Sequence, residues 1–329
     1  MDVNTAFRFK GLAAVLAACM CLGAAAAAQA ADYPSKPVEL LVNFPPGGGT
    51  DVVARAFVEA ARPHMAHGFI VTNRPGAAGA IGLTEIGRAK PDGYRVGFVT
   101  VDMTSVPHLG LTKLQVNDFV PVAMLSEDPS ALTVRADAPY KTLEEFIAAA
   151  RKAPGSLQVA NPGTGSIYHL AAEMFERAVG VDLNPVPFTG ANPAVLSLLG
   201  GHIDAVVTSP AEVAAHVAAG KLRILGVMAE RRVANFPEVP TLREKGHDVV
   251  IGAWRGMIAP KGTPQAVVDT LRNISRAAVK EPVFASTLAK QNLSIVYKDQ
   301  ADFAQVIQSD NARFKDLLGK LGMLGSAAH

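Results

Sequence analysis

The fold of this chain is decided by one stretch, Val38-Glu39-Leu40-Leu41-Val42-Asn43-Phe44-Pro45-Pro46-Gly47-Gly48-Gly49-Thr50-Asp51-Val52-Val53-Ala54-Arg55. Its first seven residues are mostly β-branched or apolar and end at a proline pair, which predicts a short buried strand. Three glycines follow, and they let the backbone turn sharply and let a ligand approach the main chain without meeting a Cβ. Thr50 or Asp51 is then expected to cap a helix. The free N–H groups of that helix N-terminus would form a seat for a small anion, and a plain strand-to-helix turn is the alternative interpretation.

The first thirty residues have the layout of a secretory signal peptide. Arg8 and Lys10 form a short basic region, residues 11–28 form an uncharged run rich in alanine and leucine, and a small-x-small site ends at Ala30. We therefore expect cleavage after Ala30 and a periplasmic product. A lipoprotein-type box that ends at Cys19 is the rival interpretation, with a lipidated N-terminus. An uncleaved membrane anchor is disfavoured, because the run is alanine-rich and marginal in length.

Composition narrows the function of the remaining chain. Both cysteines, Cys19 and Cys21, lie in the leader, so the mature chain has no thiol for a disulfide, a metal site or a nucleophile. Cleavage leaves 29 basic and 28 acidic residues, a formal charge of +1. A near-neutral chain without a basic run argues against a nucleic-acid partner. About 300 residues are enough to bury one or two apolar cores.

The remaining sequence alternates between strand-like and helix-like segments, which predicts α/β lobes with parallel sheets. Strands are expected at 38–44, from 69, and at 94–100, 119–125, 131–135, 157–160, 184–188, 203–208, 222–228 and 248–253. One helix is expected to begin at residue 52, a second to end at about residue 90, a third to begin at 142 and another to begin at 282. Further helices are expected at 167–179, 193–199, 211–219, 264–279 and 301–321. In the helix that begins at 142, Glu145 would complete a capping box with Thr142. We expect a discontinuous domain 1 (31–128 and 252–329), an inserted domain 2 (129–251) and a ligand cleft between them.

Two glycine loops carry the chemistry that the sequence suggests. They are Gly47-Gly48-Gly49-Thr50-Asp51 and Gly163-Thr164-Gly165-Ser166, each before a predicted helix. If the loops face each other, backbone N–H groups and the hydroxyls of both loops would hold a carboxylate at each end of a ligand. Asp51 is expected to cap its helix and pair with Arg55 at i+4 rather than touch an anion. Alternatively, Asp51 would hold an amino or hydroxyl group of the ligand.

Catalytic and metal-binding alternatives find little support in the sequence. The first loop lacks the Lys-Ser/Thr ending of a P-loop, and Gly165-Ser166-Ile167 does not form a nucleophile elbow. Ser166 and His169 would be neighbours on a helix, but a hydrolytic triad lacks further partners. The histidines show no metal-ligand spacing, and His169 is more readily interpreted as a packing or capping residue. Trp254, the only tryptophan, is expected to pack in the core, with a hinge or cleft-wall position as the alternative.

A series of short motifs runs through nearly the whole mature chain. In order they are Tyr33–Pro37, Gly47–Arg55, Asn73–Ala77, Pro91–Tyr94, Gly163–Ser166, His169–Ala171, Pro187–Gly190, Gly200–Asp204, Pro237–Thr241 and Ala259–Pro264. Each motif is weak by itself, but their order and spacing resemble the Bug-type extracytoplasmic solute receptors, the binding proteins of tripartite tricarboxylate transporters.

The resemblance implies a two-lobed, type II-like periplasmic binding fold that closes on a small carboxylate. Main-chain groups and ordered waters would hold the ligand, without a dedicated arginine. With the residues at the predicted strand ends, the expected ligand-binding set is Phe44, Gly48, Gly49, Thr50, Asp51, Thr100, Asn161, Gly163, Thr164, Gly165, Ser166, His169, Phe188, Thr189, Gly190 and Asp204.

The sequence departs from the family pattern at three places. Pro45-Pro46 and Asn161-Pro162 replace the smaller residues that are usual at the pocket rim, and Leu114-Gln115-Val116-Asn117-Asp118 lacks the usual Tyr-Asp-Pro. The first two departures widen the expected ligands from dicarboxylates and tricarboxylates to aromatic or monocarboxylic acids.

The function expected from these observations is that of a monomeric periplasmic receptor that delivers a carboxylate to the membrane components of a tripartite tricarboxylate-type transporter. We expect no catalytic residues, no metal and no cofactor. A sensor that presents its ligand to a signalling partner is the first alternative. An exported hydrolase of the same fold is the second, and a fold shared by many functions does not by itself exclude it.

Overall fold

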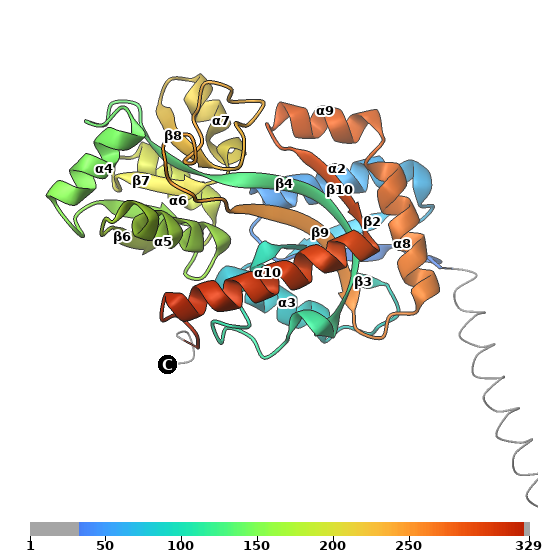
Figure 1. Cartoon of the computed structure of the whole chain (residues 1–329). Coiled ribbons are helices and arrows are strands. Elements are labelled where there is room, and N and C mark those ends of the chain that lie inside the picture. The colour runs from blue at the N-terminus through green and yellow to red at the C-terminus, as the bar shows by residue number, and fades with distance from the viewer. Residues whose placement is uncertain (1–32, 326–329) are drawn as a thin grey trace, which may run out of the picture.

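The computed structural model describes residues 33–325 (Figure 1). The predicted signal peptide, its cleavage site and Cys19 lie outside the described residues. The strands are β1 (Val38–Val42), β2 (Phe69–Asn73), β3 (Arg95–Thr100), β4 (Phe119–Arg135), β5 (Gln158–Asn161), β6 (Asn184–Pro187), β7 (Ala205–Thr208), β8 (Leu222–Met228), β9 (Gly252–Pro260) and β10 (Ile295–Asp299). The helices are α2 (Gly49–Ala61), α3 (Ala80–Gly87), α4 (Leu143–Lys152), α5 (Ile167–Val179), α6 (Ala191–Leu199), α7 (Pro210–Ala218), α8 (Gln265–Ala278), α9 (Pro282–Lys290) and α10 (Gln300–Lys320).

Two sheets meet along the long strand β4, and they give the chain its two-lobed α/β fold. The strand order in the first lobe is β2-β1-β3-β9-β4. Strands β2, β1 and β3 are parallel to one another, and β9 is antiparallel to both of its neighbours, β3 and β4. In the second lobe the far half of β4 pairs with β7 and β8, and β7 continues to β5 and β6. Figure 1 shows β4 and β9 running between the lobes, with helices flanking each sheet.

The strand β4 corrects one prediction from the sequence. Residues 119–125 and 131–135 were expected to be separate strands, but they belong to one strand of 17 residues. The polar stretch between them resembles a turn in composition. It stays extended because Ser126 to Pro129 pair with Arg255 to Gly252 of β9. The pairing partner of β4 changes from β9 to β7 after residue 129, which is close to the domain boundary predicted at 128/129. The domain division itself stays a prediction.

The second connection between the lobes begins later than expected. A return strand was predicted at 248–253, but β9 begins at Gly252. The preceding residue, Ile251, is outside the strand but bonds two others: its N–H donates to the carbonyl of Met228 at the end of β8, and its carbonyl accepts from the N–H of Ser130 within β4. The sequence analysis also missed β10, a five-residue strand that pairs with the edge of β4.

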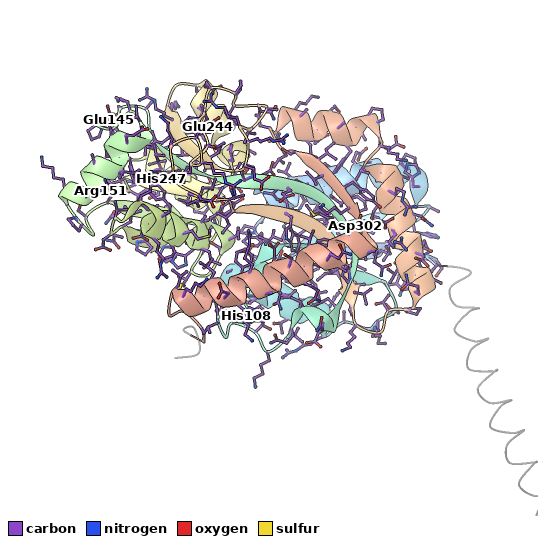
Figure 2. All side chains as sticks on the ribbon, in the orientation of Figure 1. His108, Glu145, Arg151, Glu244, His247 and Asp302 are labelled. Atoms are coloured by element: carbon purple, nitrogen blue, oxygen red, sulfur yellow. The ribbon has the colours of Figure 1, made fainter. Side chains whose placement is uncertain are left out.

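Helix ends show where local sequence signals hold. Thr142 caps α4, and its side chain accepts a bond from Glu145 N, as predicted. Figure 2 shows Glu145 and Arg151 at opposite ends of α4, an arrangement that complements the helix dipole. The predicted cap of α2 at Thr50 or Asp51 is wrong. The cap position is Gly48, because the helical backbone begins at Gly49, and the Asp51 side chain accepts a bond from Gly47 N at 2.9 Å.

Apolar side chains fill both faces of the first sheet. Phe57 of α2 packs against Phe69 and Phe98, with ring centroids 5.3 and 6.4 Å apart. Trp254 of β9 is buried, as predicted, and packs edge-on against Phe303 of α10. Within residues 33–325, none of the helices is both long and apolar enough to cross a membrane.

Candidate functional site

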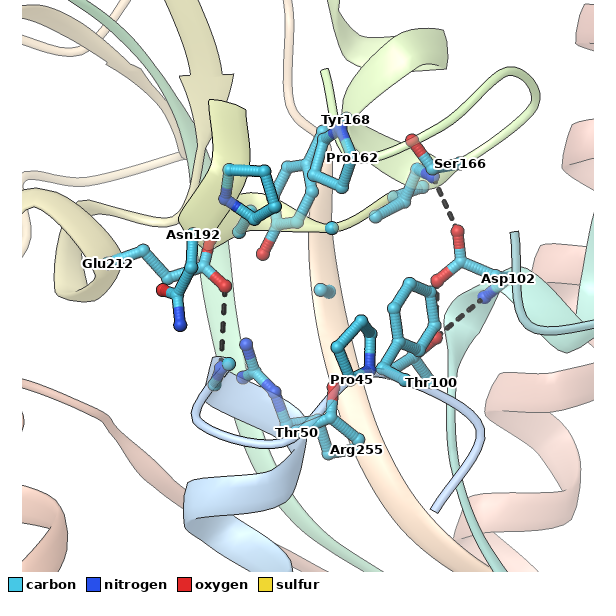
Figure 3. Close-up of a pocket in the computed structure, with 18 of the residues that line it drawn as sticks. Pro45, Thr50, Thr100, Asp102, Pro162, Ser166, Tyr168, Asn192, Glu212 and Arg255 are labelled. Carbon is cyan, nitrogen blue, oxygen red and sulfur yellow. Dashed lines mark hydrogen bonds between the residues drawn. The ribbon is translucent and has the colours of Figure 1, made fainter. Parts of the chain in front are cut away.

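A pocket of about 240 Å³ lies between the two lobes (Figure 3). Its walls come from the loops that follow β1, β3, β5 and β6, from the start of α7 and from β9. Ligand sites of α/β proteins are commonly found at the carboxyl ends of strands. The lining residues are Phe44, Pro45, Pro46, Gly48, Gly49, Thr50, Thr100, Asp102, Pro162, Ser166, Ile167, Tyr168, Gly190, Ala191, Asn192, Pro193, Glu212, Ala253 and Arg255.

At one end of the pocket, α2 begins against an acidic side chain of the other lobe. The Gly49 N–H donates to Glu212 Oε1 at 3.4 Å, and Glu212 belongs to the first turn of α7. Glu212 Oε2 also accepts from Ser209 N at 3.3 Å and so completes a capping box. Burial raises the pKa of Glu212, although the nearby Arg255 charge and the N–H donors of Gly49 and Ser209 oppose the shift.

A buried arginine lies beside that helix start. Arg255 of β9 donates through Nη1 to Asp128 Oδ2 at 2.5 Å, and the two side chains are 2% and 3% exposed. Ser126 Oγ lies 3.5 Å from the same nitrogen, and Nε has no hydrogen-bond partner within residues 33–325. Asp128 Oδ1 accepts from Ser294 N at 3.0 Å. The Asp128 carboxylate therefore already balances the Arg255 charge.

Arg255 also explains why Gly49 must be a glycine. A Cβ at Gly49 would lie 2.8 Å from Arg255 Nη2 and 3.5 Å from Glu212 Oε1. Because Asp128 holds the guanidinium, Arg255 has little freedom to withdraw. Gly48, by contrast, leaves room for a Cβ, whose nearest neighbour would be the Pro45 carbonyl at 3.7 Å.

At the other end of the pocket, an acidic side chain of the first lobe reaches the second. Asp102 lies in the 3₁₀ turn Val101–Thr104 after β3, and its Oδ1 accepts from Ile167 N at 2.7 Å, at the start of α5. The Thr100 hydroxyl donates to Asp102 Oδ2. Burial raises the pKa of Asp102 to about 6, even though both hydrogen bonds and the Arg255 charge favour the carboxylate.

Tyr168 adds a second polar group without a partner. Its side chain is 7% exposed and lines the pocket. The hydroxyl has no hydrogen-bond partner within residues 33–325, and Figure 3 shows it pointing toward the end of the pocket that holds Glu212 and Arg255. A buried hydroxyl without a partner is costly, so a ligand group that bonded it would gain free energy.

The structure brings part of the predicted residue set to the pocket wall. The members that line it are Phe44, Gly48, Gly49, Thr50, Thr100, Ser166 and Gly190. Those that do not line it are Asp51, Asn161, Gly163, Thr164, Gly165, His169, Phe188, Thr189 and Asp204.

Several of the latter residues hold the loops in place. Asp51 bonds Arg55 Nε at 2.9 Å, which confirms the predicted i+4 pair, and it also accepts from Asn73 Nδ2. Asn161 Oδ1 accepts from Gly163 N. His169 Nδ1 accepts from Gly165 N at 3.1 Å, so His169 acts as a packing and capping residue. Asp204 accepts from Gln158 N at 2.8 Å, away from the pocket.

The sequence analysis missed the charged residues of the pocket. Asp102, Glu212 and Arg255 all line it, although the family pattern implied a pocket without a dedicated arginine. Two of them have a local signal: Ser209 and Glu212 stand in capping-box spacing, and Arg255 is the one charged residue in the apolar segment Ala253-Trp254-Arg255-Gly256-Met257-Ile258. Neither signal tells which cavity the side chain enters.

Several known proteins are similar to this chain in sequence and in fold. Residues 53–323 match the TctC family, described as the tripartite tricarboxylate transporter family receptor. Protein BugT of Bordetella pertussis is 33% identical over 276 residues, which cover 82% of this chain and 84% of BugT. A TctC solute binding protein from Polaromonas, solved without ligand, is 47% identical with a TM-score of 0.70 and covers 88% of this chain and 99% of that one. MatC from Rhodopseudomonas palustris, solved with bound malate, is 28% identical with a TM-score of 0.81, and the match covers 87% of this chain and 100% of MatC.

The family match over most of the chain, together with a pocket between two lobes, defines a solute receptor of the periplasmic-binding-protein class. The chain belongs to the TctC family, the Bug-type receptors of tripartite tricarboxylate transporters. The members of this family are substrate-binding receptors rather than enzymes.

Proposed function

We propose that this chain captures a small carboxylate in the pocket between its lobes and delivers it to the membrane components of a tripartite tricarboxylate-type transporter. The observation that carries the proposal is the pocket itself, built from both lobes and bordered by the buried cation of Arg255. The malate bound to MatC supports the carboxylate as the ligand class. We further propose that the mature chain begins at Ala31 and acts as a monomer in the periplasm.

Contacts between the lobes support a hinge-type closing motion around the ligand. Asp102 reaches α5 from the first lobe, and Glu212 reaches α2 from the second. Both contacts join loop or helix ends, whereas β4 and β9 continue through the junction as unbroken strands. Rotation about these two strands would open the pocket and break these contacts, together with the bonds that Ser105 Oγ donates to the Gly165 carbonyl and Arg177 Nη1 donates to the Lys320 carbonyl.

A binding experiment with two matched glycine variants tests the proposal. Isothermal titration of the mature protein against monocarboxylates, dicarboxylates, tricarboxylates and aromatic acids should identify at least one ligand. In the Gly49→Ala variant the added methyl group would crowd Arg255 Nη2 at 2.8 Å, so we expect at least a tenfold loss of affinity. Gly319→Ala, which lies outside the pocket wall and whose Cβ has room next to Leu324 Cδ1 at 3.6 Å, should bind as the wild type does.

Two results would contradict this function. If the protein is folded and free of carried-over ligand but binds none of the acids, the proposal that its ligand is a small carboxylate is wrong. Equal affinity in wild type and Gly49→Ala would place the ligand outside this pocket. Delivery to a transporter is tested separately: a deletion strain should lose uptake of the identified acid, and wild-type protein, but not Gly49→Ala, should restore it.

A further inference from the structure

Two helix N-termini face the pocket, and the protein already places one of its own carboxylates at each. Glu212 accepts from the first N–H of α2, and Asp102 accepts from the first N–H of α5. Each carboxylate comes from the lobe opposite to the helix it caps. Helix N-termini favour negative charge, so these are the positions where the acid groups of a dicarboxylate would bind. In this chain the two positions are occupied by side chains.

The charges around the pocket are consequently acidic in balance. Arg255 is the cation in the wall, and Asp128 pairs with it at 2.5 Å. Asp102 and Glu212 then remain as two carboxylates without a paired cation within the described part of the lining. A ligand with two or three carboxylates would bring like charges close to them, which is unfavourable. A ligand with one positive and one negative group would match the wall better.

The polar groups of the wall gather at two ends of the pocket. The Tyr168 hydroxyl and the Arg255 guanidinium lie at one end together with the Glu212 carboxylate, and the Tyr168 hydroxyl and Arg255 Nε have no partner within residues 33–325. Asp102 lies across the pocket from Arg255 in Figure 3. Asp102 receives bonds from Ile167 N and Thr100 Oγ1, and a carboxylate with about four lone-pair positions can accept more.

The space between these ends is bounded mainly by apolar groups. Prolines and other apolar side chains form a large part of the wall, namely Phe44, Pro45, Pro46, Pro162, Ile167, Ala191, Pro193 and Ala253. Such a wall favours a ligand with a hydrocarbon body, because burial of apolar surface is the main attractive term in an enclosed pocket.

We propose that the ligand is an amino acid in its zwitterionic form, with an apolar side chain. Its carboxylate faces Arg255 and the Tyr168 hydroxyl, its ammonium group donates to Asp102, and its side chain contacts the proline-rich wall. This inference rests on the proposed capture of a carboxylate and names the ligand class at the same site. It makes Asp102 the residue that distinguishes an amino acid from a simple acid of the same shape.

Three ligands of one shape test this inference by isothermal titration at neutral pH. They are phenylalanine, 3-phenylpropanoate, which lacks the ammonium group, and phenylsuccinate, which carries a second carboxylate instead. We expect phenylalanine to bind at least tenfold more tightly than either of the others. Leucine and 4-methylpentanoate repeat the comparison with a smaller body, in case the aromatic ring does not fit.

Asp102→Asn is the diagnostic variant, because asparagine keeps an acceptor for Ile167 N but removes the charge. The preference for the amino acid over its deaminated analogue should fall at least tenfold in this variant. Asp204→Asn is the matched control, since Asp204 is outside the pocket wall, and it should leave the preference unchanged. Circular dichroism and thermal unfolding of both variants should confirm that they are folded.

The outcomes separate this inference from the proposed function. If phenylsuccinate or another acid without an ammonium group binds most tightly, and Gly49→Ala abolishes that binding, the receptor function stands and the amino-acid inference is overturned. An unchanged preference in folded Asp102→Asn would also overturn it. If no carboxylate of any kind binds, the proposed function falls and the inference falls with it.

Discussion

Removal of the Asp128 carboxylate should strongly destabilise the protein, because it leaves the buried positive charge of Arg255 without its ion-pair partner. Arg255 and Asp128 are 2% and 3% exposed, and their 2.5 Å bond is the one close ion contact that the described residues offer Arg255. The remaining neighbour on Nη1, Ser126 Oγ, is 3.5 Å away. Breaking one partner of a buried pair typically costs about 3–5 kcal/mol. The lost acceptor for Ser294 N adds roughly 1 kcal/mol.

This loss would be a large fraction of the stability of a native domain, which is about 5–15 kcal/mol. With a urea dependence of about 3 kcal/mol/M, a loss of about 4 kcal/mol would lower the unfolding midpoint by more than about 1 M. Trp254 provides the assay, because it is the only tryptophan, is buried and neighbours Arg255 in sequence. Its fluorescence should report the unfolding of Asp128→Leu directly.

A double-mutant cycle checks the physical reason. Asp128→Leu and Arg255→Met alone should each be strongly destabilised, whereas the double variant should recover most of the loss, since a buried ion pair can be replaced by apolar side chains at little cost. If Asp128→Leu loses less than about 1 kcal/mol, or if the double variant is less stable than both single variants, the argument from an uncompensated buried charge is refuted.

Three further predictions concern the site and the leader. The pKa of Asp102 is raised from 3.8 to about 6, so ionisation of Asp102 lowers the free energy of unfolding by about 3 kcal/mol above pH 6. This loss of stability is relieved as the pH falls through about 6 toward 4. Asp102→Asn should therefore be more stable than wild type at about pH 8 and equally stable near pH 4, as measured by urea unfolding. Ser166→Ala removes the side chain that accepts from His169 N at 3.3 Å and caps α5, so we expect a loss of about 1 kcal/mol in the same assay. The intact mass of the exported protein should correspond to a chain that begins at Ala31, and a lipidated N-terminus at Cys19 would show that the rival leader interpretation is right.

The parts of the fold that sequence predicted well are those with local causes. Helix α5 spans Ile167–Val179 as expected, because a serine cap begins it and Gly180 ends it in the left-handed conformation. The order of strands and glycine loops likewise predicted two α/β lobes, and the series of short motifs resembled the family. Hydrophobic pattern, capping and turn chemistry act over a few residues, so one sequence is enough to locate them.

The parts that sequence missed depend on contacts between distant segments. The polar stretch from Ser126 to Ser130 continues as a strand because β9 and β8 pair with it, and no local pattern announces those partners. The same holds for the pocket: the sequence located two helix N-termini, and the structure fills them with Asp102 and Glu212, which lie 65 and 163 residues from the N–H groups they bind.

The sequence by itself determined that this chain is a two-lobed receptor with glycine loops before its helices, because those features follow from periodicity, caps and motif order. Only the tertiary structure decided what the loops face. Charge, burial and donor balance in a pocket depend on which side chains the folded lobes bring together across it. Arg255, Asp102 and Glu212 come together in the pocket wall only there, and Asp128 pairs with Arg255 only there.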